Sequence, residues 1–424
     1  MGELDLLGCD LPDHWAIALI DDVTSKVGSG ATPRGGASVY VDEGPAFIRS
    51  QNVHDHEFRT EGIARLTASA ADQLRGVSVE LGDVLLNITG DSILRACVAP
   101  ATVLPARVSQ HVAIVRSNGR VDPRFLQKWL TLPAMKDYML GHSSGGTRKA
   151  ITKGHILSFP IPLPPLGEQR AIAATLGALD DKIESNRRTV GLLQELVGLH
   201  FKRALSDAKP VLTPLAQIAT ITKGRSYKSV ELQDSETALV TLKSIDRRGG
   251  YKSDGLKPYV GEYKAEQVVT PGELVVAQTD LTQSAEVVGR GVRIPPVREY
   301  ATLVASLDLA IVRPGPSMPP EYLYGLLTSE SFRQHCRSHV TGTTVLHLAK
   351  DAMPTWLAPV IPSDDQEAFA RVAASLMARV DSLNHESDRL RRLRDTLLPE
   401  LLSGRIRVPE ATSVVQDGIQ TEGA

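Results

Sequence analysis

Residues 160–205 read PIPLPPLGEQRAIAATLGALDDKIESNRRTVGLLQELVGLHFKRAL, and this stretch decides the fold. A proline-rich lead enters a long segment in which apolar residues recur at alternating spacings of four and three. This spacing is the heptad pattern of a helix that presents one seam to a partner helix. The predicted seam consists of Ile172, Leu176, Leu179, Ile183, Asn186, Val190, Leu193 and Val197, with His200 beyond it.

The same pattern returns near the C-terminus when the chain is compared with itself at a shift of 197 residues. At this shift Gln169 meets Gln366, and residues 113–116 (AIVR) meet residues 310–313 (AIVR). One shift that holds over so many places indicates a tandem duplication, with a unit much longer than solenoid repeats. The second seam consists of Phe369, Ala373, Leu376, Val380, Leu383, Ser387, Leu390, Leu397 and Leu401, with Arg394 as a further polar position.

Each copy is predicted to contain a β-rich globular part, because its apolar runs are short, β-branched and separated by Gly, Pro and Asn. One amphipathic helix is expected inside each part, at 122–140 and 319–337, and one long helix after it, at 167–206 and 364–403. We therefore expect an α+β chain whose long helices, each ~55–60 Å, form an antiparallel coiled coil with an approximate two-fold axis. The other arrangement is that each seam packs on its own globular part. The predicted boundaries are 1–160, 161–209, 210–360, 361–408 and a polar, disordered tail at 409–424.

Antiparallel pairing gives the polar seam positions specific meanings. Asn186 should lie near Leu383 or Ser387, where a buried polar group can fix the register. His200 and Arg394 are expected where the seam opens toward a globular part or a partner protein. Gly404 is placed to end the second helix as a C-terminal cap.

Composition excludes several classes of protein. No apolar run is long enough to span a membrane, and the N-terminus lacks the features of a secretory signal. Three scattered cysteines form neither a disulfide framework nor a zinc site, so we expect a reducing cytoplasm. Lys and Arg (47) nearly balance Asp and Glu (49), but residues 107–154 hold nine cations against two aspartates. Such a patch can contact phosphates or be only a solvated face.

No catalytic motif is present in the sequence. We find no GxxxxGK[ST] loop, no GxSxG elbow, no HExxH and no Asp/Asn-Pro-Pro-Tyr/Phe motif of amino-methyltransferases. Residues 54–56 (HDH) are interpreted as a solvated turn rather than a metal site, and Asp180-Asp181 as solubilising charge on a helix. The chain is therefore predicted to be non-catalytic, without a metal or cofactor of its own.

Three motifs carry a family resemblance: residues 85–92 (LLNITGDS), 110–113 (QHVA) and 160–169 (PIPLPPLGEQ). Together with the duplication and residues 401–408 (LLSGRIRV), they resemble the specificity (S) subunit of Type I restriction–modification systems. The resemblance covers about 15–408 and weakens in the second copy, where SDDQ at 363–366 replaces LGEQ.

The resemblance implies two target-recognition domains, each reading one half of a bipartite, asymmetric double-stranded DNA site. The coiled coil would set the spacer and dock two modification (methyltransferase) subunits, which use S-adenosylmethionine to methylate adenine. Restriction (translocase-nuclease) subunits would join the full complex, a phage-defence system. The other readings are a coiled-coil scaffold that binds a non-DNA ligand, or a specificity chain of another phage-defence system.

Base reading needs polar side chains on projecting elements, and phosphate contacts need cations and Gly-rich loops. We expect about a third of the following candidates to contact DNA. Positions shared by the two copies should serve structure or backbone contact, and sequence discrimination should lie chiefly in 24–75 and 220–268. The candidates are Arg49, Gln51, Asn52, Thr89, Ser92, Ser143, Ser144, Thr147, Arg148 and Lys149 in the first copy, and Lys223, Arg225, Tyr227, Lys243, Ser244, Arg247, Thr279, Gln283, Thr343 and Thr344 in the second.

Overall fold

The computed structural model describes residues 8, 10–143, 150–247, 249–252, 255–282 and 284–409. The chain divides into two compact units, which we call unit 1 (Met1–Asn186 with Glu386–Ala424) and unit 2 (Arg187–His385). The division falls near the middle of both long helices, so each unit contains one β-rich part and half of each helix.

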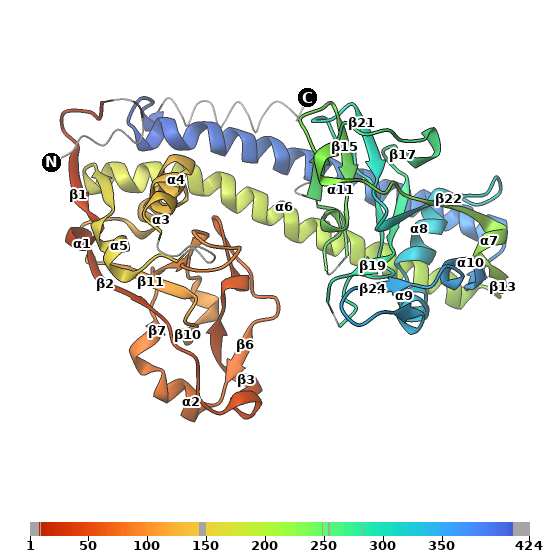
Figure 1. The fold of residues 1–424 in the computed structure, drawn as a ribbon, viewed down its shortest axis with the longest axis horizontal. Coiled ribbons are helices and arrows are strands. Elements are labelled where there is room, and N and C mark those ends of the chain that lie inside the picture. Colours follow the sequence, from red (N-terminus) through yellow and green to blue (C-terminus); the bar gives the residue numbers. More distant parts are fainter. Residues whose placement is uncertain are drawn as a thin grey trace. The chain divides into compact units, whose positions relative to one another are not determined.

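Unit 1 contains two four-stranded sheets (Figure 1). The central sheet has the order β2-β11-β8-β9 and is antiparallel, and the outer sheet has the order β6-β3-β10-β7, in which β3 and β10 are parallel. The strands are β2 (Thr24–Ser29), β11 (Val112–Ser117), β8 (Val84–Asn87) and β9 (Ala96–Val98) in the central sheet, and β6 (Ala64–Leu66), β3 (Tyr40–Ile48), β10 (Ala106–Val108) and β7 (Ser78–Val79) in the outer sheet.

Strand β11 shows why the central sheet is buried on both faces. Its side chains alternate between two cores, because successive residues of a strand point to opposite faces. Ala113 and Val115 join the core that contains the helices, whereas Val112 and Ile114 join the core between the two sheets. A continuous apolar run in the sequence therefore becomes the middle layer of the unit.

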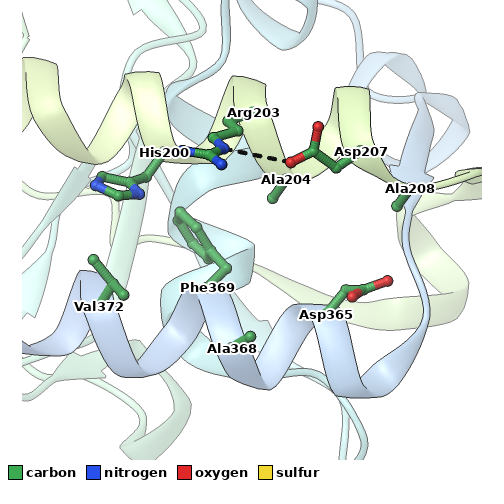
Figure 2. Close-up of a pocket in the computed structure, with 9 residues that line it drawn as sticks. All are labelled: His200, Arg203, Ala204, Asp207, Ala208, Asp365, Ala368, Phe369 and Val372. Carbon is green, nitrogen blue, oxygen red and sulfur yellow. Dashed lines mark hydrogen bonds and ion pairs between the residues drawn. The ribbon is translucent and has the colours of Figure 1, made fainter.

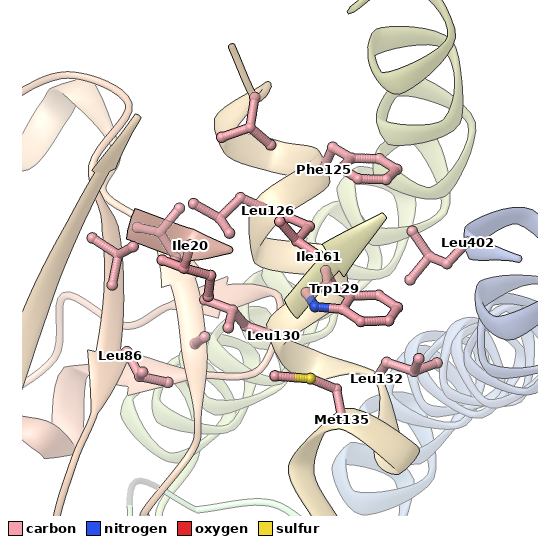
Figure 3. Close-up of a cluster of buried hydrophobic side chains, with 14 of the residues drawn as sticks. Ile20, Leu86, Phe125, Leu126, Trp129, Leu130, Leu132, Met135, Ile161 and Leu402 are labelled. Atoms are coloured by element: carbon pink, nitrogen blue, oxygen red, sulfur yellow. The ribbon is translucent and has the colours of Figure 1, made fainter. Parts of the chain in front are cut away.

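The helical core of unit 1 is built around Trp129 (Figure 3). This side chain is fully buried, and its indole N–H donates to the Pro160 carbonyl at 2.8 Å. Leu86 from β8, Ile161 from β12 (Pro160–Leu163) and Leu402 belong to the same cluster. Strand β1 (Ala16–Leu19) pairs with β12. Unit 1 also contains β4 (Val53–His54), β5 (Glu57–Phe58), α1 (Ile20–Val23), α2 (Ala68–Gln73) and α5 (Lys153–Ser158).

Unit 2 repeats the central sheet, the outer sheet and the β1-β12 pair of unit 1, and its β22 alternates between two cores in the same way as β11. Its central sheet has the order β14-β22-β18-β20, its outer sheet has the order β16-β15-β21-β17, and β13 pairs with β25. A further sheet, β19-β24-β23, belongs to unit 2. The elements are β13 (Val211–Pro214), α7 (Leu215–Ile218), β14 (Ala219–Lys223), β15 (Thr237–Val240), β16 (Leu256–Pro258), β17 (Val268–Val269), β18 (Leu274–Ala277), β19 (Thr279–Asp280), β20 (Gly291–Arg293), β21 (Thr302–Ala305), β22 (Leu309–Pro314), β23 (Val340–Thr341), β24 (Leu346–Leu348), α10 (Ala352–Thr355) and β25 (Leu357–Val360).

The single short helix predicted in each copy is wrong, because the structure has two helices in each place. In unit 1, α3 (Pro123–Thr131) ends before α4 (Pro133–Gly141), since Pro133 holds the preceding Leu132 in an extended conformation. In unit 2, α8 (Pro320–Thr328) is followed by α9 (Glu330–Ser338) without a proline between them. There Ser329 is extended and accepts a hydrogen bond from the Phe332 N–H at 3.2 Å, so it starts a new helix.

The two long helices are confirmed to within one residue at each end. They are α6 (Leu166–Asp207) and α11 (Ser363–Leu402), and they pack antiparallel (Figure 1). Gly404 follows α11 with a φ of +74°, the left-handed conformation expected of a C-terminal glycine cap. The predicted tail at 409–424 lies outside the described residues, apart from Pro409.

None of the predicted seam residues is exposed. The prediction that Asn186 lies near Ser387 is confirmed within unit 1, where its amide nitrogen donates to Ser387 Oγ at 3.3 Å and to Glu386 Oε2 at 2.9 Å. The Lys182 ammonium group also contacts Glu386, at 3.2 Å. A buried polar site thus joins α6 and α11 at this point.

Candidate nucleic-acid interface

Two predicted DNA-contacting side chains are buried in equivalent loops. Asn52, in the turn after β3, accepts from the Arg49 N–H at 3.0 Å and donates to the Arg59 carbonyl at 2.9 Å. In unit 2, Ser244 Oγ accepts from the Thr241 N–H at 3.3 Å in the turn after β15. Both side chains are fully buried. Their hydrogen bonds therefore close the two loops from inside the protein.

Arg49 and Gln51 extend from the same loop of unit 1. Arg49 Nη2 and Gln51 Nε2 both donate to the Gly62 carbonyl, at 2.9 and 3.2 Å. Gln51 is exposed and Arg49 is half-buried, so both retain polar groups that can face a ligand.

The other candidates of unit 1 are partly engaged or not described. Ser92 Oγ accepts from the buried Asn87 amide at 3.1 Å, and Ser143 Oγ donates to the Leu140 carbonyl at 2.7 Å. The candidates that lie outside the described residues are Ser144, Thr147, Arg148 and Lys149, together with Gln283 of unit 2.

The two threonines Thr89 and Thr279 occupy the same place in the two units. Each follows the inner strand of its central sheet and contacts the residue just before β11 or β22. Thr89 Oγ1 lies 2.7 Å from His111 Nδ1, and Thr279 Oγ1 donates to Asp308 Oδ1 at 3.0 Å. The threonine is thus the same in both units, but its partner is a histidine in unit 1 and an aspartate in unit 2.

The candidates of unit 2 include several exposed cations. Lys223 at the end of β14 and Lys243 are exposed, and within the described residues they form no ion pair. Arg225 Nε lies 3.4 Å from the Tyr259 hydroxyl, and the Lys257 ammonium lies over the Tyr227 ring at 5.7 Å from its centre.

The remaining candidates of unit 2 lie on two other loops. Arg247 is exposed and forms an ion pair with Glu286 at 3.3 Å. Thr343 and Thr344 are exposed between β23 and β24.

Asp280 is a structural residue of this surface that the sequence did not reveal. Its buried carboxylate accepts from Thr282 N and Oγ1 and from the Val287 and Val288 N–H groups. Burial raises the pKa of Asp280, but these hydrogen bonds outweigh it and hold the pKa below its ordinary value. One carboxylate therefore organises the loop that follows β19. An aspartate after Thr279, where the first copy has Gly90 after Thr89, was the only signal in the sequence.

A buried ion cluster in unit 1 overturns two interpretations of the sequence. Asp180 is not surface charge: its carboxylate binds the Lys128 ammonium and accepts from Arg394 Nη1 at 3.0 Å. The 54–56 segment is not a solvated turn either, because His56 is largely buried and its Nδ1 lies 3.1 Å from Lys128 Nζ. Asp55 meanwhile forms an ion pair with Lys136 at 2.5 Å.

The cluster changes the protonation of its members. Burial, reinforced by the Lys128 charge, holds the pKa of His56 well below its ordinary value. Burial also lowers the pKa of Lys128, although Asp180 opposes the shift. Arg394 thus marks where the seam meets the globular part of unit 1, as expected, because Lys128 belongs to α3 and His56 to a loop near β4.

At His200 the seam also opens, and a groove lies between α6 and α11 in unit 2 (Figure 2). His200 and Phe369 line it, with Arg203 and Asp207 paired at 3.4 Å at its rim. The neighbouring Phe201 is buried instead, with its ring centre 5.3 Å from that of Tyr322 on α8. Gly325 makes this contact possible, since a Cβ there would lie 2.4 Å from the Phe201 ring.

In the part of the chain that the structure describes, no group of three or more His, Cys, Asp or Glu side chains could hold a metal ion. No helix in the same set is long and apolar enough to cross a membrane.

The comparisons with known proteins agree on one class. A family model described as Type I restriction modification DNA specificity domain matches residues 77–193, which run from β7 into α6. The chain is 22% identical over 433 residues to the Type I restriction enzyme MjaVIII specificity subunit of Methanocaldococcus jannaschii, covering 95% of this chain and 96% of the relative. It is also 38% identical over 109 residues to the putative MjaX specificity subunit of the same organism, a match that covers 25% of this chain and 24% of that relative.

The fold agrees with a solved structure of the same class. The Type I restriction-modification system S subunit from M. genitalium matches with a TM-score of 0.52 and 15% identity, covering 93% of this chain and 98% of that one. The protein is thus a DNA specificity module made of two β-rich parts and paired helices. Over nearly its whole length it resembles the specificity subunits of Type I restriction–modification systems, which are the non-catalytic subunits of their enzymes.

Proposed function

We propose that this chain reads a bipartite, asymmetric DNA site, with the β-rich part of unit 1 on one half-site and that of unit 2 on the other. The observation that carries the proposal is the repeated topology, because two copies of one frame suit the two-fold relation between DNA strands. Both copies lie in one chain, so their side chains can diverge and the two half-sites can differ in sequence.

The paired helices α6 and α11 are proposed as the spacer between the half-sites and as the docking site for two methyltransferase subunits. Support comes from α6, where Leu192, Leu196 and Leu199 lie on one face at helical spacing and are exposed (65%, 39% and 61%). Apolar side chains grouped in this way favour a protein partner over solvent. S-adenosylmethionine would bind to the methyltransferase subunits, and translocase-nuclease subunits would complete a cytoplasmic phage-defence complex.

The test is to co-express the chain with its methyltransferase subunit in a host without adenine methylation and to map methylated adenines. The expected result is one bipartite motif with a fixed gap, present only when this chain is expressed. Matched expression of the methyltransferase alone is the control. Methylation without this chain, or a methylated motif that is continuous rather than bipartite, would contradict the proposal.

A further inference from the structure

One edge of the central sheet in unit 1 brings three loops together. Strands β2 and β8 end there and β11 begins there, because both pair antiparallel with β11. The first loop is held tightly: the Gly30 N–H donates to the Val112 carbonyl at 2.9 Å, and the Ala31 N–H to the Val108 carbonyl at 3.1 Å. A Cβ on Gly30 would lie 1.9 Å from the Val108 oxygen, so only glycine allows this approach. The loop is therefore fixed against the turn between β10 and β11.

A chain of side-chain hydrogen bonds joins the three loops. The Thr32 hydroxyl donates to Gln110 Oε1, Gln110 Nε2 lies 3.3 Å from His111 Nε2, and His111 Nδ1 lies 2.7 Å from Thr89 Oγ1. The amide nitrogen of Gln110 can only donate, so a neutral His111 must accept at Nε2 and carry its proton on Nδ1. Thr89 then accepts from Nδ1, and its own hydroxyl hydrogen remains available.

This set of hydrogen bonds leaves two donors unused. Among the residues that the structure describes, the second N–H of the exposed Gln110 amide and the hydroxyl hydrogen of the half-buried Thr89 have no acceptor. Arg34, on the first loop, is exposed and has no ion-pair partner among the residues that the structure describes. Two neutral donors at a sheet edge whose first loop also carries an exposed guanidinium suit the oxygen atoms of a phosphate.

Unit 2 has the same frame without this set of donors. Gly224 repeats the role of Gly30, since a Cβ there would lie 2.1 Å from the Ser306 carbonyl oxygen. Leu307 and Asp308 stand where unit 1 has Gln110 and His111, and the Thr279 hydroxyl donates to Asp308. The donor chain thus belongs to unit 1 and is not required by the fold.

We propose that Thr32, Arg34, Thr89, Gln110 and His111, which we call the loop edge of unit 1, form a contact with the DNA phosphate backbone. Arg34, Gln110 and Thr89 donate to phosphate oxygens, while Thr32 and His111 position the amide and the hydroxyl. The contact is independent of base sequence, and it rests on the proposed function. Of these five residues, the sequence had suggested only Thr89 as a DNA contact.

The test measures Kd of the chain assembled with its methyltransferase subunits. The probes are a duplex with the mapped methylation site and a random duplex of equal length, at several salt concentrations. Gln110→Leu, which installs the residue of unit 2, and Thr89→Val should each raise Kd about 3- to 10-fold for both duplexes. Arg34→Ala should do the same and lower the salt slope by about 1. Thr89→Ser keeps the hydroxyl and should bind like the wild type, which controls for folding, and Leu307→Ala is the matched control in unit 2.

Two results would overturn the inference. One is an unchanged affinity of Gln110→Leu and Thr89→Val for the random duplex. The other is a change of the preferred bases in Gln110→Leu at constant affinity for random DNA, which would assign base reading to this residue. A wild-type complex that does not distinguish the two duplexes would instead count against the proposed function, because the backbone contact is measured on random DNA.

Discussion

Replacing Pro319 by aspartate is expected to stabilise unit 2, because unit 1 has an aspartate at the equivalent position. In unit 1, Asp122 caps α3 by accepting from the Arg124 N–H at 2.9 Å, and its own N–H donates to the buried Gln169 Oε1 at 2.8 Å. In unit 2, Pro319 has no N–H and leaves α8 without a side-chain cap. The buried Gln366 Oε1 consequently has no hydrogen-bond partner among the described residues.

The size of the effect follows from three terms. A new side-chain cap contributes about 1 kcal/mol, and a hydrogen bond to a buried acceptor contributes about 1 kcal/mol. Loss of the rigid proline costs about 0.5–1 kcal/mol through the unfolded chain. The net gain in the free energy of unfolding is therefore about 1–1.5 kcal/mol, which corresponds to an opening constant about 5- to 10-fold smaller.

Hydrogen exchange can assign this gain to one unit. Amides of α8 and β22 should exchange about 5- to 10-fold more slowly in Pro319→Asp, while those of α3 and β11 in unit 1 should not change. Pro319→Ala supplies the N–H without the carboxylate and should give part of the gain. Asp122→Pro is the mirror variant and should speed exchange in unit 1. Unchanged or faster exchange of α8 in Pro319→Asp would refute the reasoning.

Three further predictions concern stability. Asp180→Asn leaves Lys128 without its counter-charge and should lower the free energy of unfolding of unit 1 by about 3–5 kcal/mol. Urea unfolding followed by tryptophan fluorescence, to which Trp15 and Trp129 of unit 1 and Trp356 of unit 2 contribute, measures this loss. A loss below about 1 kcal/mol would contradict the prediction. Burial lowers the pKa values of His54 and His56, to about 4 for His54. The unfolded state therefore binds more protons than the folded state, and the free energy of unfolding should fall as the pH drops below about 6.5. The urea midpoint of the double variant His54→Gln/His56→Gln should depend less on pH between about 7 and 5 than that of the wild type. Gly404→Ala should lower the urea midpoint of unit 1 by the equivalent of about 1 kcal/mol or more. The reason is that φ is +74° at this position and a Cβ there would lie 2.5 Å from Pro12 Cγ. An unchanged midpoint would refute this prediction.

Periodicity predicted the long helices because it is a local signal repeated over many turns. The bounds of α6 and α11, their antiparallel pairing and the contact of Asn186 with Ser387 all follow from spacing in the sequence. The break between α3 and α4 could also have been read, since Pro133 restricts the residue before it.

The side chains of the candidate interface could not be assigned in the same way. Asn52 and Ser244 are polar residues after strands, which made them candidates, yet both are buried as loop caps. Asp180, Lys128, His56 and Arg394 are far apart in the sequence, and only the fold brings them together. Burial and partners are non-local properties, so residue type alone did not separate a DNA contact from a structural group.

The two units also show how far one frame tolerates different chemistry. The shift of 197 residues relates Lys128, Asp180 and Arg394 of unit 1 to Gly325, Met377 and Val197 of unit 2. The first set is a buried ion cluster, whereas Met377 and Val197 belong to an apolar core and Phe201 packs against Gly325. Replacing a buried ion pair by packed apolar residues is often neutral or stabilising, whereas removing one partner is costly. The ion cluster is therefore not required for packing against the helices. What it adds is a geometry that links a loop, α3 and both long helices of unit 1 through directional contacts.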